Sequence, residues 1–66
     1  MTPIQRGRKL ASLRKARGWS RYRLASESGI SRDHIGNIER GRRDPTISLL
    51  IRLAKALDVP VMTLVE

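Results

Sequence analysis

The chain has 66 residues and a formal net charge of +8, and it contains no cysteine. Its length allows one small domain at most, and the lack of cysteine excludes disulfides and thiolate zinc sites. No apolar run approaches the roughly 18 residues of a membrane span, and the N-terminus does not resemble a signal peptide, so we expect a cytoplasmic protein.

The positive charge is concentrated in the first two-thirds of the chain. Residues 1–43 contain 12 basic and 3 acidic side chains, whereas residues 44–66 contain 2 basic and 3 acidic ones. Such an imbalance favours a polyanionic partner, either nucleic acid or an acidic membrane surface. Charge alone does not separate these two partners.

The first predicted helix begins after Thr2, a favourable N-cap that is followed by Pro3 and by Gln5 at the capping-box position. Gly18 is placed to end this helix in a left-handed turn. The helical spacing predicts a buried stripe of Leu10, Leu13 and Ala16, which Ile4 could join.

Two short helices follow, each with a serine cap in front and a glycine behind. The second predicted helix covers Ser20–Ser28 and the third covers Ser31–Arg40, with Ile35 and Ile38 on its buried side. Only Gly29-Ile30 separates them, and a link this short forces a steep crossing angle. Residues 20–40 are therefore predicted to form a helix-turn-helix, whose recognition helix is 31–40.

A basic loop at residues 42–45 precedes a fourth helix, which we expect from Thr46 to Leu57 before Val59-Pro60 breaks it. Residues 61–65 are predicted to form a short fifth helix with Leu64 inward. The predicted buried stripe of the fourth helix is Ile47, Leu50, Leu53, Ala54 and Leu57. The expected fold is all-α, a compact five-helix bundle in which residues 1–66 form a single domain.

The outward face of the third helix carries side chains of the kinds that read base edges. Arg32 can bond guanine and Asn37 can bond adenine, each through two hydrogen bonds, while Asp33 could accept from cytosine or orient an arginine. Gly36 leaves a gap that would let the helix approach the bases closely. A merely solvated helix face often looks similar, so this stripe alone leaves both interpretations open.

The run Ile38-Glu39-Arg40-Gly41-Arg42-Arg43-Asp44-Pro45 is a specific motif. Together with Arg17–Ser20 and Ser28–Ser31, at consistent spacing, it resembles the phage repressor and Cro-type (XRE) helix-turn-helix family. The resemblance covers residues 7–65 and implies a lambda repressor-like DNA-binding fold. It also implies an internal ion pair between Arg14 and Glu39, and contact of Arg32, Asp33 and Asn37 with DNA bases.

The chain departs from the family pattern in two places. Arg21 stands where the family usually has glutamine, and Tyr22-Arg23 replaces a segment that usually contains glutamate. The second helix is therefore unusually basic, which suggests stronger anchoring to phosphates. Arg6 occupies a position that is often hydrophobic, so the start of the first helix could be shifted, with Ile4 as the substitute.

Residues that flank an inserted recognition helix straddle the DNA backbone. We therefore expect phosphate contacts from Ser20, Arg21, Arg23, Ser31, Arg40, Arg42 and Arg43. The two serines are helix caps first. Further contacts are left open at Tyr22, His34 and Gly36, since the tyrosine could pack locally and the histidine could act as a local cap. A lone histidine is not a metal site.

The last third of the chain has more apolar side chains than one small core needs. The excess side chains are Leu49, Ile51, Val61, Met62 and Val65. They could be core edge and ordinary surface, or they could form a dimer interface. A dimer would present two recognition helices about 34 Å apart, which matches half-sites one DNA turn apart. We favour a homodimer, at least on DNA.

These features predict a sequence-specific transcriptional regulator that binds double-stranded DNA, a repressor acting as a dimer on a two-fold symmetric operator. The alternative is an antitoxin or protein-interaction module with a DNA-targeting role, which would use the apolar surface for a partner protein. We expect neither an enzyme nor a cofactor or metal, because no acid–base pair, metal cluster or phosphate loop is present. Membrane binding fits the charge but not its position on helix-turn-helix residues.

Overall fold

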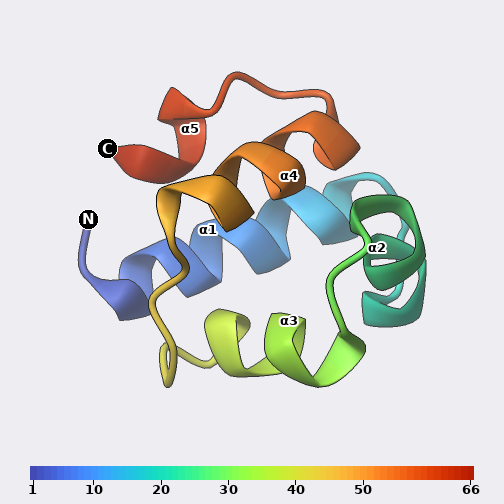
Figure 1. The fold of residues 1–66 in the computed structure, drawn as a ribbon, viewed down its shortest axis with the longest axis horizontal. Coiled ribbons are helices and arrows are strands. Elements are labelled where there is room, and N and C mark those ends of the chain that lie inside the picture. The colour runs from blue at the N-terminus through green and yellow to red at the C-terminus, as the bar shows by residue number, and fades with distance from the viewer.

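The computed structural model describes all 66 residues and contains five helices and no strand. The helices are α1 (Pro3–Ala16), α2 (Arg21–Ser28), α3 (Arg32–Glu39), α4 (Ile47–Leu57) and α5 (Met62–Val65). Figure 1 shows α1 through the middle of the molecule, with α4 and α5 on one side of it and α3 on the other. The predicted all-α, five-helix architecture is confirmed. No helix has the length and apolar character needed to cross a membrane.

Local side chains fix the start of each of the first four helices. In each case a hydroxyl oxygen accepts a hydrogen bond of 3.0–3.2 Å from the backbone N–H three residues further on. The four caps are Thr2, Ser20, Ser31 and Thr46. Each satisfies a donor that the first turn of a helix leaves unpaired. The predicted starts are therefore correct.

The helix-turn-helix link consists of three residues with distinct tasks. Gly29 ends α2 in the left-handed conformation with φ +72°, Ile30 is buried in the core, and Ser31 already caps α3. A residue with a Cβ atom would be strained at this φ. The turn therefore redirects the chain within one residue, and α3 leaves at a steep angle to α2 (Figure 1).

The core is formed by apolar side chains from all five helices and from the turn between α2 and α3. Its ten buried members are Leu10, Leu24, Ile30, Ile35, Ile38, Leu50, Leu53, Ala54, Leu57 and Leu64. The predicted stripes were wrong at three positions, because Ala16, Ile4 and Ile47 are exposed. The inward face of α1 is formed by Gly7, Leu10 and Arg14 instead, and Ile47 protrudes at the first turn of α4, before the buried stripe begins at Leu50.

Three arginines bind backbone carbonyls at helix C-termini, and none of these contacts was predicted. Arg6 donates to the carbonyl oxygens of Leu64 and Val65 at 2.8 and 3.2 Å, and its side chain also pairs with Asp44. α1 begins at Pro3, so its start is not shifted. Ile4 is exposed and does not take the place of the hydrophobic residue that the family often has at position 6. Arg17 donates to Leu57 at 3.0 Å, and Arg52 donates to Ser28 and Gly29 at 3.3 and 2.9 Å. These bonds satisfy carbonyls that the last helical turn leaves unpaired.

α1 and α3 approach closely at Gly7. A Cβ atom built on Gly7 would lie 2.3 Å from the carbonyl oxygen of Ile38 and 2.6 Å from that of Glu39. These are backbone atoms, so the contact can be relieved only if the two helices move apart. The absence of a side chain at Gly7 therefore sets the distance between α1 and α3.

We expect Gly7→Ala to lower the free energy of unfolding by about 3 kcal/mol, because overpacking at a rigid contact forces the backbone to shift. Urea denaturation followed by circular dichroism measures this loss. Gly18→Ala is the matched control: Gly18 has φ +71° and open space around it, so only the left-handed conformation, about 1 kcal/mol, is penalised. Equal losses in the two variants would contradict the close-approach argument.

Candidate nucleic-acid interface

A buried carboxylate joins the three helices that form the candidate interface. The side chain of Glu39, at the end of α3, is 1% exposed. Arg14 from α1 donates to it through Nε and Nη2, at 2.7 and 3.0 Å, and Arg21 from α2 donates through Nε at 2.8 Å. Arg14 also donates to the carbonyl oxygen of Trp19 at 2.8 Å. Glu39 therefore holds α1, the start of α2 and the end of α3 in one arrangement.

The protonation of this network follows from its geometry. Burial by itself would raise the pKa of Glu39, but the hydrogen bonds and positive charges of Arg14 and Arg21 outweigh burial and hold the pKa below its ordinary value. The hydrogen bond to Glu39 in turn raises the pKa of Arg14. Both groups are therefore charged at neutral pH.

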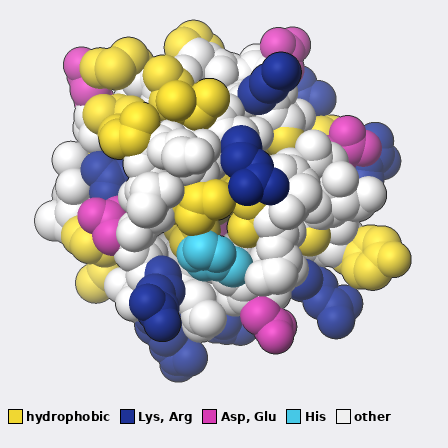
Figure 2. Space-filling model, in the orientation of Figure 1, with side chains coloured by type: hydrophobic (Ala, Val, Ile, Leu, Met, Phe, Trp, Pro, Cys, Tyr) yellow, Lys and Arg dark blue, Asp and Glu magenta, His cyan; other side chains and the backbone are white.

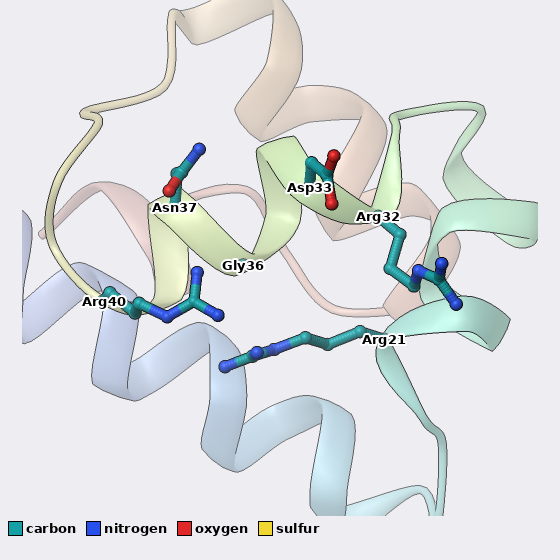
Figure 3. Close-up of a pocket in the computed structure, with 6 residues that line it drawn as sticks. All are labelled: Arg21, Arg32, Asp33, Gly36, Asn37 and Arg40. Carbon is teal, nitrogen blue, oxygen red and sulfur yellow. The ribbon is translucent and has the colours of Figure 1, made fainter.

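An open cleft of about 370 Å³ lies between the start of α2 and the outward face of α3. No hydrophobic side chain lines it. The lining residues are Arg21, Arg32, Asp33, Gly36, Asn37 and Arg40 (Figure 3). We call this the recognition cleft. It contains all three predicted base-reading side chains, two of the seven predicted phosphate contacts and one residue whose role the sequence left open.

Two guanidinium groups converge at the middle of the recognition cleft. A Cβ atom built on Gly36 would lie 2.9 Å from Nη1 of Arg40 and 3.6 Å from Nη1 of Arg21. Figure 3 shows the two side chains pointing toward one another below Gly36. Helical side chains lean toward the N-terminus, so an arginine four residues after a glycine can fold back over it. Two like charges brought together in this way form a site that favours an anion.

The predicted base-reading side chains project outward from α3. Arg32 and Asp33 are exposed and Asn37 is half-buried. The Arg32 guanidinium carbon lies 5.8 Å from the centre of the Tyr22 ring, within the range of a cation–π contact. Tyr22 therefore supports Arg32, which answers part of the question that the sequence left open about this tyrosine.

The other predicted phosphate contacts lie around the cleft. Ser20 and Ser31 are exposed caps at two helix starts. Arg23 pairs with Glu27 at 2.9 Å and lies over the Trp19 ring at 4.8 Å, so its side chain is engaged within the chain. Arg42 and Arg43 are exposed in the turn after α3, where their backbone N–H groups donate to the carbonyl oxygen of Asn37. His34 is half-buried and does not line the cleft.

Hydrophobic side chains gather at the edge of the molecule over α5 and the start of α4, away from α3 (Figure 2). Leu49, Val61 and Val65 are half-buried against the core, whereas Met62 is 51% exposed. The exposed large hydrophobic side chains on α4 are Ile47, at 60%, and Ile51, at 51%. Much of the predicted dimer surface is therefore shared with the core, and Ile47 was missed because its spacing predicted burial.

Comparison with known proteins identifies relatives over most of the chain. The helix-turn-helix family HTH_3 matches residues 10–64. The HTH-type transcriptional regulator SutR of Escherichia coli is 43% identical over 57 residues, which are 86% of this chain and 32% of SutR. The control protein C.SmaI of Serratia marcescens is 46% identical over 50 residues, which are 76% of this chain and 60% of that protein. The chain thus spans about a third of the length of SutR.

Solved structures agree with this result. The restriction-modification controller protein C.AhdI from Aeromonas hydrophila superposes with a TM-score of 0.91 at 37% sequence identity. The match covers 94% of this chain and 94% of that one. The arrangement of the five helices is therefore shared with a protein of similar length.

We expect Glu39→Gln to lower the free energy of unfolding by about 3 kcal/mol at pH 7, because it leaves Arg14 buried without its counter-charge. The pKa of Glu39 is lower in the folded chain than in the unfolded one. Its contribution is therefore complete above the ordinary pKa of 4.5 and is lost as the pH falls through the lower folded value.

The difference in free energy of unfolding between wild type and Glu39→Gln should consequently become smaller as the pH is lowered below 4.5. Urea denaturation of both chains at a series of pH values measures it. A gap that stays constant down to acidic pH would show that the charge of Glu39 contributes nothing.

Proposed function

Since the chain belongs to the helix-turn-helix family, we propose that it is a sequence-specific transcriptional regulator that binds double-stranded DNA and acts as a repressor in the cytoplasm. The observation that carries this proposal is the recognition cleft. Its six lining residues are all polar or glycine, and three are arginines. Five of them belong to α3 and its C-cap, on the side of the helix opposite the buried Ile35 and Ile38, and Arg21 comes from the start of α2. The relatives described above are named as regulators and control proteins.

In the proposed complex α3 enters the major groove, which is wide enough for one helix. Arg32 and Asn37 each form two hydrogen bonds with a base, and Asp33 accepts one from cytosine or orients Arg32. The cation–π contact with Tyr22 restricts the Arg32 side chain before DNA binds. A side chain ordered in advance loses less conformational entropy on binding.

Phosphate contacts hold α3 in register without reading sequence. Arg21 and Arg40 converge across Gly36 and are suited to grip the backbone at one edge of the groove. Arg42 and Arg43, exposed in the turn after α3, are suited to the other edge. The caps Ser20 and Ser31 can add a hydroxyl or a helix-start amide, while Arg23 would first have to leave Glu27.

The proposal includes a homodimer on a two-fold symmetric operator. Three large apolar side chains, Ile47, Ile51 and Met62, are at least half exposed on α4 and α5. A second copy that covers this surface would place two recognition helices about 34 Å apart. The same surface could serve a different partner protein, and the operator itself distinguishes the two cases.

Selection of binding sites from a pool of random duplexes, at physiological salt, tests the proposal. We expect a motif made of two inverted half-sites whose centres lie one helical turn apart. A motif with a single half-site would contradict the dimer, and a pool that shows no enrichment would contradict sequence-specific binding altogether.

Two arginine variants separate reading from anchoring. We expect Arg32→Ala to weaken binding to the selected operator by about 1–3 kcal/mol and to relax preference at one base position. Arg42→Ala should weaken binding to all duplexes and reduce the slope of log affinity against log salt by about one. Fluorescence anisotropy titrations at several salt concentrations measure both effects.

For each arginine these measurements distinguish a base contact from a phosphate contact. If Arg32→Ala weakened every sequence equally, Arg32 would be a phosphate contact. If the salt slope of Arg42→Ala equalled that of wild type, Arg42 would not face a phosphate.

A further inference from the structure

A second groove runs along the outward face of α1. Its volume is about 690 Å³, larger than that of the recognition cleft. The lining residues are Arg8, Ala11, Ser12, Lys15, Ala16, Arg21 and Glu39. We call it the α1 groove. Five of its residues come from α1, and none of these five is among the predicted DNA contacts.

The spacing of residues along α1 explains the shape of this groove. Arg8, Ser12 and Lys15 are separated by four and three positions, so they share one face of the helix. The small side chains of Ala11 and Ser12 leave the face low between the two long basic side chains, and the small side chain of Ala16 lies just beyond Lys15. At a rise of about 1.5 Å per residue, these ends are about 10 Å apart along the helix.

The charge of the α1 groove is not neutralised within the chain. Arg8 and Lys15 are exposed and take part in none of the five ion pairs of the structure. The only acidic residue that lines the groove is Glu39, which is buried and already bound by Arg14 and Arg21. The groove therefore presents unpaired positive charge above a floor of small side chains, a combination suited to a chain of phosphates.

Arg21 connects the α1 groove with the recognition cleft, because its side chain lines both. Its Nε atom is bonded to Glu39, which leaves the two terminal nitrogens for another partner. Its Nη1 atom lies on the side of Gly36, in the recognition cleft. A DNA strand that touches Arg21 while α3 occupies the major groove would therefore continue onto α1.

We propose that the α1 groove binds the phosphodiester backbone of one DNA strand next to the half-site read by α3, with Arg8 and Lys15 as phosphate contacts. The inference rests on the proposed function, and it extends the DNA footprint from α2 and α3 to α1. Arg8 and Lys15 stand about 10 Å apart along α1, so each can meet a different phosphate of the same strand. Glu39 is then a positioning residue, which aims Arg21 at the junction of the two clefts.

The test compares Arg8→Ala and Lys15→Ala with Lys55→Ala in salt titrations against the selected operator. Lys55 is an exposed lysine on α4 that lines neither cleft. Alanine favours helix at all three positions, and thermal unfolding by circular dichroism verifies that each variant folds. We expect Arg8→Ala and Lys15→Ala each to lower the salt slope by about 0.9 and the affinity at 0.15 M salt about five-fold, with base preference unchanged. Lys55→Ala should leave the slope unchanged.

Neutral methylphosphonate linkages, placed one at a time in the operator, locate the contact. At the phosphate that faces Lys15, the substitution should weaken wild type about five-fold but leave Lys15→Ala unaffected. Equal sensitivity of both proteins at every position would overturn the proposal. A slope loss in Lys55→Ala as large as in Lys15→Ala would also overturn it, because the effect would then reflect total charge.

Results that contradict the α1 groove can be distinguished from results that contradict the proposed function. A phosphate contact carries no sequence information, so the same slopes can be measured on an unrelated duplex. If wild type did not prefer any sequence, the proposal of sequence-specific regulation would be contradicted. The salt slopes on the unrelated duplex would still test whether the α1 groove contacts phosphates. If wild type selected an operator and all three variants had its slope, only the α1 groove would fail.

Discussion

The burial of one carboxylate, that of Glu39, determines how α1, α2 and α3 are arranged. A buried charge is tolerated only when its partners are in place, and here those partners come from α1 and α2 while the carboxylate belongs to α3. An orientation of α3 that turned Glu39 away from α1 would leave Arg14 buried without its counter-charge. The absence of a side chain at Gly7 lets α1 approach closely enough for this network to form. The outward face of α3 is thus fixed by contacts on its inward side.

The large number of arginines has two separate uses. Arg6, Arg17 and Arg52 bind carbonyls at the ends of α5, α4 and α2, and Arg14 is buried with Glu39. A chain of this size buries few apolar side chains, and these bonds between distant segments add to what its core provides. Of the other exposed arginines, Arg8 lies on α1 and Arg23 pairs with Glu27 on α2. The rest lie on α3 or in the turn after it: Arg32, Arg40, Arg42 and Arg43. Net charge therefore overstates the number of side chains free to meet a polyanion, because several are part of the scaffold.

Features that depend on neighbours in sequence were predictable, and features that depend on distant contacts were not. The caps Thr2, Ser20, Ser31 and Thr46 and the turn at Gly29 were found because each involves residues within one helical turn. The carbonyl contacts of Arg6 join residues 58 and 59 positions apart, and no local pattern indicates them. Periodicity predicted which side chains share the apolar face of each helix. It did not show how far along the helix other elements cover that face, so Ile47 was wrongly predicted to be buried. The convergence of Arg21 with Arg40 depends on the crossing of two helices, which spacing along one of them does not reveal.

The bonds of Arg6 have a topological consequence. They tie the first helical turn of α1 to the last residues of α5, and Figure 1 shows the two termini side by side. The chain is therefore close to a closed ring, a property that makes circular permutation feasible. Every residue that lines either cleft lies in one continuous segment of the chain, residues 8–40. The turn at Asp58–Pro60 lies outside that segment, and its first and last residues are exposed while Val59 is half-buried against the core. The chain can therefore be opened at this turn without cutting the segment that lines the two clefts.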